Sequence, residues 1–130
     1  MKYIKIYEWN FPLFNKSNNP KIKDYVICKF EKSTLSSLTE RPELKEYIES
    51  NIGQICDYDK DKHFTYTVMY FNVPNEIKHM LFNYSYMNNG KLAMGYVYYF
   101  KENQILHWSK NEEQMKDELE LILNINKYNI

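Results

Sequence analysis

The sequence predicts an α+β fold, in which a mixed or antiparallel sheet of about five strands has two or three helices packed on one face. Three observations support this class. Residues 90–100 alternate with the period of a strand, residues 42–52 carry apolar side chains at helical spacing, and an amphipathic C-terminal helix begins after Ser109. The length of 130 residues, 44% of them apolar, fits one globular domain spanning residues 1–130.

The N-terminal part is expected to hold two strands. Residues 2–9 alternate weakly, and residues 24–30 alternate with Val26, Cys28 and Phe30 on one side. A hairpin of these two strands is the economical topology, although residues 10–21 form a long connection with two prolines.

A helix is expected over residues 42–52. Pro42 fits its first turn and Gly53 stands where a C-terminal cap belongs. Its apolar stripe consists of Leu44, Tyr47, Ile48 and Ile52. Residues 54–62 are polar and are interpreted as a connector.

Residues 63–72 alternate as a strand, which Pro74 ends. Residues 75–89 fit two structures. Their first half favours a helix capped by Gly90, whereas their second half alternates like a strand that enters an Asn-Asn-Gly turn. We favour the helix.

Residues 90–100 are apolar on both faces, which predicts a central strand covered on two sides, or on one side plus a partner. A polar break over residues 101–104 separates this strand from a shorter one at 105–108. The last helix has Ser109 and Glu112 in the spacing of a capping box. Its buried stripe is expected to be Met115, Leu119, Ile122 and Leu123.

Composition limits the function. The chain has 17 basic and 17 acidic residues, so it has no long-range field to attract nucleic acid or anionic lipid. No apolar run has the length of a signal peptide or a membrane span. The two cysteines, Cys28 and Cys56, are not spaced for metal or a redox pair, which indicates a reducing, cytoplasmic compartment. One Ala and one Arg beside 15 Asn indicate an AT-rich genome, such as that of a phage or mobile element.

Catalytic and metal-binding patterns are weak. Asp57, Asp59 and Asp61 have the spacing of a calcium loop, but Lys62 and Val68 stand where that loop requires Gly and Glu. We therefore predict no metal site and no cofactor. His107 is the best candidate for acid–base chemistry, which leaves a small hydrolase or nuclease as one alternative function. The favoured prediction is that the protein is not an enzyme.

Residues 92–99, LAMGYVYY, resemble in part the stacking strand of RNA-recognition domains. Four residues match that pattern: Gly95, Tyr96, Val97 and Tyr99. Leu92, Ala93 and Met94 stand in place of its basic residue, glycine and first aromatic. The resemblance implies a second alternative, a single-stranded nucleic-acid binder that stacks bases on Tyr96 and Tyr98.

The leading hypothesis is a non-enzymatic inhibitor that neutralises a partner protein, of the immunity-protein, antitoxin or phage anti-defence type. Thirteen tyrosines offer aromatic anchors, and the acidic start of the last helix offers orientation of a basic partner. The expected partner-binding residues are Glu112, Glu113, Asp117, Glu120, Tyr96, Tyr98 and Trp108. The sequence predicts neither the identity of the partner nor the oligomeric state.

Overall fold

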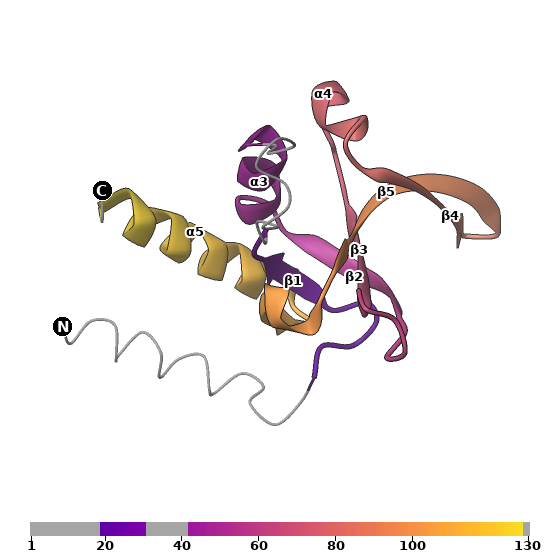
Figure 1. Cartoon of the computed structure of the whole chain (residues 1–130), viewed down its shortest axis with the longest axis horizontal. Helices are drawn as coiled ribbons and strands as arrows, with labels where there is room; N and C mark the ends of the chain where they lie inside the picture. Colours follow the sequence, from indigo (N-terminus) through magenta and orange to yellow (C-terminus); the bar gives the residue numbers. More distant parts are fainter. Residues whose placement is uncertain (1–18, 31–41, 129–130) are drawn as a thin grey trace.

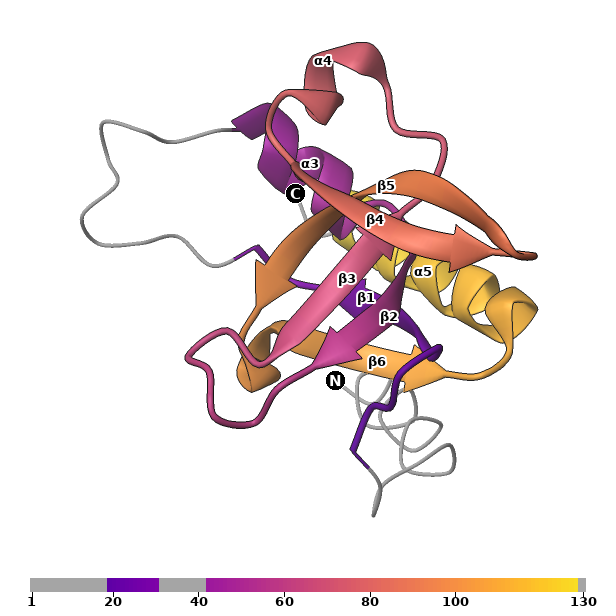
Figure 2. The ribbon, with the colours of Figure 1, turned by 90° about the vertical axis from the view of Figure 1, so that its right-hand side faces the viewer.

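The fold is built on one six-stranded antiparallel sheet, in the order β4-β5-β3-β2-β1-β6, whose strands are labelled in Figures 1 and 2. The computed structural model describes residues 19–30 and 42–128. The strands are β1 (Tyr25–Cys28), β2 (Gly53–Tyr58), β3 (Tyr66–Tyr70), β4 (Phe82–Asn88), β5 (Lys91–Phe100) and β6 (Ile105–Ser109). The helices are α3 (Pro42–Glu49), α4 (Asn75–Lys78), the 3-10 turn η2 (Glu102–Gln104) and α5 (Glu112–Tyr128). The predicted α+β class, with a C-terminal helix, is confirmed.

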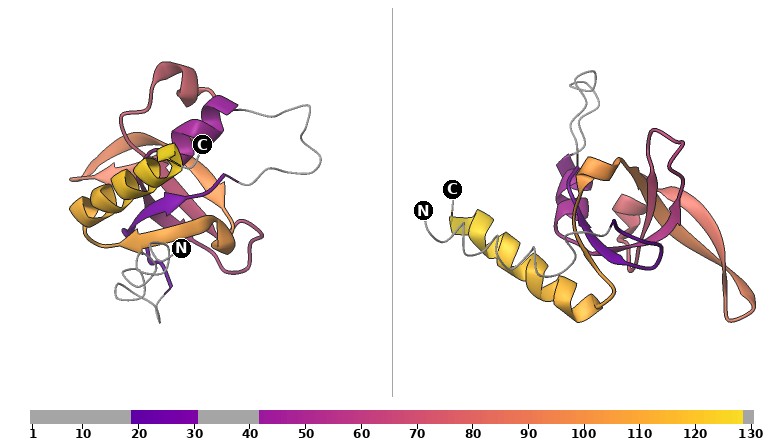
Figure 3. Two further views of the ribbon diagram at one scale, coloured as in Figure 1. Left: turned by 90° about the vertical axis from the view of Figure 1, so that its left-hand side faces the viewer. Right: turned by 90° about the horizontal axis from the view of Figure 1, so that it is seen from below.

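The helices occupy both faces of the sheet at β1, a finer arrangement than the single covered face that the sequence indicated. Side chains alternate across a strand, so neighbours on β1 point in opposite directions. Val26 and Cys28 join the large core cluster that contains the α3 side chains, whereas Ile27 joins a second cluster with Met115 and Leu119 of α5. Figure 3 shows α5 at one end of the molecule, far from the β4–β5 hairpin.

The polar segment predicted as a connector, residues 54–62, contains strand β2, so that prediction was wrong. Ile55 is the only large aliphatic residue of β2, which hides the alternation in the sequence. Gly53 is the first residue of this strand and not the cap of α3. A side chain at Gly53 would collide with Val68 and lie 3.1 Å from the ring of Tyr70, so only glycine fits there.

The ambiguous segment, residues 75–89, divides into a short helix and a strand. Only Asn75–Lys78 is helical, and residues 82–88 form β4, so the favoured helix was wrong for the second half. The strand alternative was correct for this half. Asn89 and Gly90 form the turn that follows the strand, and both adopt positive φ angles, of 54° and 82°. That conformation closes a tight two-residue hairpin whose twist matches that of the flanking strands.

The last helix forms where predicted, but its N-terminal cap lies two residues further on. The side chain of Asn111 accepts a hydrogen bond from the backbone N–H of Gln114 (3.1 Å), and Ser109 accepts one from the N–H of Asn111 (3.0 Å). Met115 and Leu119 are buried as expected, whereas Leu123 is exposed. The predicted strand at residues 2–9, and its hairpin with the second strand, lie outside the described residues.

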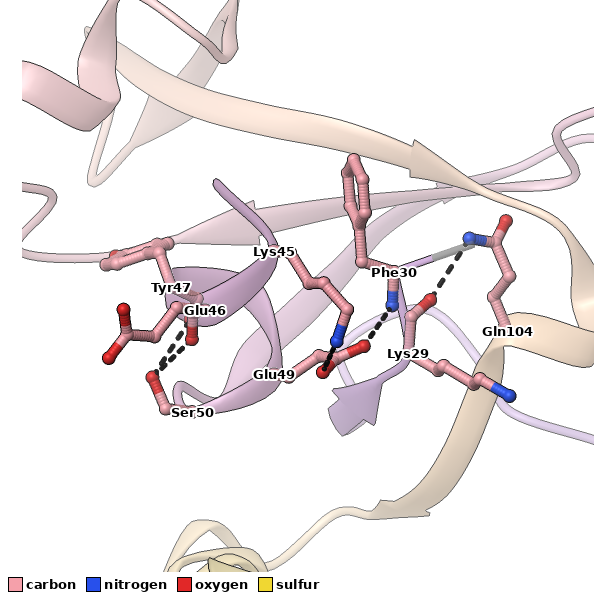
Figure 4. Close-up of polar contacts among 8 residues, drawn as sticks. All are labelled: Lys29, Phe30, Lys45, Glu46, Tyr47, Glu49, Ser50 and Gln104. Carbon is pink, nitrogen blue, oxygen red and sulfur yellow. Dashed lines mark hydrogen bonds and ion pairs between the residues drawn. The ribbon is translucent and has the colours of Figure 1, made fainter. Parts of the chain in front are cut away.

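A small polar network fixes α3 and η2 to the end of β1 (Figure 4). One carboxylate oxygen of Glu49 accepts the backbone N–H of Phe30 (2.9 Å), and the other pairs with Lys45 (2.8 Å). The side-chain amide of Gln104 donates to the carbonyl of Lys29 (3.1 Å). These bonds satisfy backbone groups at the point where β1 ends, so the chain leaves the sheet in a defined direction.

Ionisable groups in the core make the fold sensitive to alkali. Burial raises the pKa of Tyr70 well above its ordinary value and raises the pKa of Cys28 to about 12. In the unfolded chain these groups ionise near pH 10 and near pH 8.5, respectively. The folded state therefore holds its protons more tightly. The stability that these two buried, protonated groups contribute is complete at neutral pH, and it is lost as pH rises through their folded-state pKa values.

We expect Tyr70→Phe to resist alkaline unfolding better than the unsubstituted protein, because phenylalanine keeps the buried ring and has no proton to lose. The free energy of unfolding is measured by urea titration at about pH 8 and at about pH 11. The difference between the two values should be smaller for Tyr70→Phe. Tyr99→Phe, at an exposed tyrosine, is the matched control and should behave like the unsubstituted protein. Equal alkaline losses in all three proteins would contradict the prediction.

Candidate protein-binding surface

The most exposed part of the sheet consists of β4, the turn that follows it and the first half of β5. We call this segment the hairpin arm (residues 82–95). Strand β5 is ten residues long, but β3 pairs only with its second half, ending at the Tyr70–Tyr96 pair. From Lys91 to Gly95, β5 has β4 as its one neighbour among the described strands. The arm therefore extends away from the core, as Figures 1 and 3 show.

Three apolar side chains lie side by side on one face of the hairpin arm. We call Met87, Leu92 and Met94 the apolar patch; their exposed fractions are 65%, 73% and 57%. Met87 is the cross-strand partner of Leu92, and Met94 lies two residues further along β5, so all three share a face. Lys91 is the only charged residue of the arm. A group of exposed apolar side chains of this kind is typical of an interaction site.

This arrangement refines the prediction that residues 90–100 form a central strand covered on two sides, or on one side plus a partner. The second half is covered, with Val97 and Phe100 fully buried. In the first half, the face that carries Leu92 and Met94 is exposed, and β3 pairs only with residues 96–100. The sequence pattern missed the apolar patch because Leu92 and Met94 continue the same alternation as the buried residues that follow. The nearby Asn-Asn-Gly turn was the one signal that this end of the strand is a hairpin tip.

The opposite face of the arm carries tyrosines. Tyr84 and Tyr86 are half-buried, and Met69 lies over Gly95, with its sulfur 2.9 Å from the position of an added Cβ. Next to Tyr84, burial raises the pKa of the Cys56 thiol to about 11, so that thiol is protonated at neutral pH and is a weak nucleophile. This face is anchored at the root of the arm and is less exposed than the apolar patch.

The predicted aromatic anchors lie elsewhere. Tyr96, Tyr98 and Trp108 are half-buried and pack against the large core cluster. The ammonium of Lys78 lies 5.4 Å from the centre of the Tyr96 ring, and the ring of Phe30 lies 5.9 Å from that of Tyr98. These rings therefore contribute to the core.

The predicted acidic residues are exposed on α5. Glu112, Glu113, Asp117 and Glu120 face solvent, and Lys116 lies 3.6 Å and 3.9 Å from the carboxylates of Glu113 and Glu112. The structure does not bring these residues together with Tyr96 and Tyr98, because α5 packs on β1 and β6 at the other end of the sheet. Glu118 was not among the predicted binding residues. It is buried on α5, and burial, followed by the neighbouring Asp117, raises its pKa.

The residues considered for chemistry are scattered. The side chain of Asp57 accepts the N–H of Tyr58 (2.9 Å) and that of Asp59 accepts the N–H of Asp61 (3.0 Å), as local turn contacts. His107 is half-buried on β6, opposite Ile27. Within residues 19–30 and 42–128, no three His, Cys, Asp or Glu side chains gather in a group that could hold a metal ion.

Two further observations concern the whole chain. In the part of the chain that the structure describes, no helix combines the length and apolar character needed to cross a membrane. Comparison with models of known protein families, with curated proteins and with solved structures found no match.

The conformation of the turn gives a test of the arm. Gly90→Ala places a side chain on a residue with φ of 82°, where no atom lies within 4 Å of the added carbon, so the cost is backbone strain alone. We expect a loss of about 1 kcal/mol in the free energy of unfolding. Urea denaturation measures it, and Asn88→Ala, on the strand residue beside the turn, should cost clearly less. A neutral Gly90→Ala would contradict the conformation of the turn.

Proposed function

We propose that this protein is a non-enzymatic binding module that neutralises a specific partner protein by steric blockade, in the manner of immunity proteins, antitoxins or phage anti-defence proteins. The apolar patch carries the proposal. Leu92, Met87 and Met94 expose more than half of their surface each, on an arm that projects beyond the core. Burying such side chains against a partner is favourable in proportion to the apolar area removed from water.

The chemistry of the patch suits protein recognition. Methionine has an unbranched and polarisable side chain that adapts to an irregular partner surface. Few residues usually dominate the binding energy of an interface, and they lie at its centre with polar groups around them. Here Ser85 and Asn83, which lie on the same face of β4 as Met87, border the three apolar side chains. The hydroxyl of Ser85 already lies 3.9 Å from the sulfur of Met94.

The acidic face of α5 supplies a second, electrostatic part of the proposal. Glu112, Glu113, Asp117 and Glu120 are exposed and directed at solvent. Exposed charges of one sign increase the rate of encounter with a basic partner more than they increase affinity. This face lies at the end of the molecule opposite the hairpin arm (Figure 3), so it would contact a separate part of the partner.

Two free cysteines support a reducing, cytoplasmic location for this function.

The first experiment is a pulldown from native host lysate with the tagged protein, with and without nuclease. We expect one stoichiometric protein that survives nuclease. Leu92→Lys and Met94→Lys should each weaken its capture by roughly tenfold or more, because a charge would have to be buried in the interface. Asn103→Lys, which adds the same charge at an exposed residue of η2, should bind like the unsubstituted protein. The captured protein's activity should then be suppressed by the unsubstituted protein only.

Other outcomes decide between the alternatives. Retained material that nuclease removes would favour the nucleic-acid binder, with Tyr96 and Tyr98 as the next residues to change. Capture that is unaffected by Leu92→Lys and Met94→Lys would show that the apolar patch is not the binding surface.

Charge reversal on α5 tests the electrostatic part separately. Replacing Glu112, Glu113 and Asp117 with lysine should slow association several-fold at low ionic strength and change dissociation little. Surface plasmon resonance with the captured partner measures both rates, and the effect should shrink as salt is added. Unchanged association rates would remove α5 from the proposal and leave the apolar patch.

A further inference from the structure

The free edge of β4 is a feature distinct from the apolar patch. β4 is the first strand in the order of the sheet, and one of its sides has no strand beside it among the described residues. A strand in this position presents unpaired backbone N–H and C=O groups to any extended chain that approaches.

The register identifies which residues present those groups. In a two-residue turn the carbonyl of Asn88 faces the N–H of Lys91, so the backbone of Asn88 points toward β5. Backbone direction alternates along an antiparallel strand. The backbone groups of Phe82, Tyr84 and Tyr86 therefore also point toward β5. Those of Asn83, Ser85 and Met87 point outward, which leaves three N–H and three C=O groups in a row at the edge.

Natural proteins protect a free edge with charged residues, proline or a bulge. β4 has none of these features. Its sequence, FNYSYMN, contains no charge and no proline, and its pairing with β5 runs from Phe82 to Asn88 without a shift of register. Five of its seven side chains are exposed. The edge is therefore regular and uncharged, and none of the described strands pairs with it.

The same edge is complementary to itself. When two copies of β4 run antiparallel with Ser85 opposite Ser85, Asn83 of each copy stands opposite Met87 of the other, and all three outward-pointing residues fall in hydrogen-bonded pairs. On the tyrosine face, Tyr84 of one copy stands opposite Tyr86 of the other, a favourable aromatic cross-strand pair. Because β4 carries no charge, the two-fold axis brings no like charges together.

We propose that β4 pairs with β4 of a second copy of this chain, and that this pairing joins the two sheets into one continuous antiparallel sheet. Each copy uses the same edge, so the association is isologous and closes at two. The two-fold axis stands perpendicular to the sheet, so both apolar patches lie on the same face of the dimer and stay accessible. The proposal concerns the edge of the arm and is independent of the proposed partner protein.

The test is to measure the mass of the protein in solution at protein concentrations from roughly 1 μM to about 1 mM. This range brackets weak and moderate association. Light scattering should show a mass that rises from 15.9 kDa to twice that value and no further. Ser85→Lys should weaken this association by roughly tenfold or more, because it places two like charges opposite each other on the axis.

Met94→Lys is the matched control. Met94 faces Ser85 across the hairpin, one strand further from the edge, so the same charge in two copies would be well separated. This variant should dimerise like the unsubstituted protein although it is expected to lose partner capture. The two variants therefore distinguish a failure of the dimer from a failure of the proposed function.

Hydrogen exchange provides a second readout that does not depend on any variant. In the dimer the amides of Asn83, Ser85 and Met87 should become protected at high concentration, whereas those of Tyr84 and Tyr86 are protected at every concentration. A mass of 15.9 kDa throughout would overturn the proposal, and so would a dimer that Ser85→Lys leaves intact. Protection of the three amides in a monomer would show that another part of the same chain covers the edge, and would also overturn it.

Discussion

The unequal lengths of β5 and β3 determine most of what is distinctive in this structure. β5 has ten residues and β3 has five, and the two strands pair in register from Tyr66–Phe100 to Tyr70–Tyr96. On the N-terminal side of Tyr96, residues 91–95 of β5 pair only with β4 among the described strands. An isolated two-stranded hairpin is marginally stable in water. The hairpin arm therefore depends on its tight turn at one end and on its packing against the core at the other.

The root of the arm shows how that packing is achieved. The ring of Phe82 lies 6.0 Å from that of Tyr98 and 5.1 Å from that of Tyr99, so aromatic contacts cross from β4 to β5. Gly95 leaves room for Met69 to lie across the strand. These contacts explain the use of several tyrosines. Each provides a large apolar ring to cover the sheet and a hydroxyl that can stay near water.

The sequence predicted the elements whose periodicity is carried by large apolar residues. The stripe of Leu44 and Ile48 predicted α3, and that of Met115 and Leu119 predicted α5. Strand β2 was missed because it lies between two strands and needs only Ile55 and the narrow Gly53 on its core side. Its remaining residues gave the segment a polar composition, and local composition carries no information on which neighbours a strand acquires.

The candidate site was harder to predict, for a related reason. Alternation reports which face a residue occupies, and the end of the covering element decides whether that face is buried. Leu92 and Phe100 occupy the same face of β5, yet Phe100 is fully buried and Leu92 is among the most exposed residues of the chain. The point at which β3 stops is set by the positive φ of Asn72 and the turn toward Pro74, which lie some twenty residues earlier in the sequence.

Side chains and backbone groups of the arm point in perpendicular directions, so the proposed partner protein and the proposed second copy would use different surfaces of one hairpin. The side chains of the apolar patch point out of the plane of the sheet. The outward N–H and C=O groups of β4 lie in that plane. A second copy bound at the edge would leave Met87, Leu92 and Met94 uncovered and would place two such patches on one face. Two linked sites raise the effective concentration of the second binding event when a partner spans both. An uncharged edge carries a risk of aggregation in a monomer. In the proposed dimer the same edge would make the proposed binding surface bivalent.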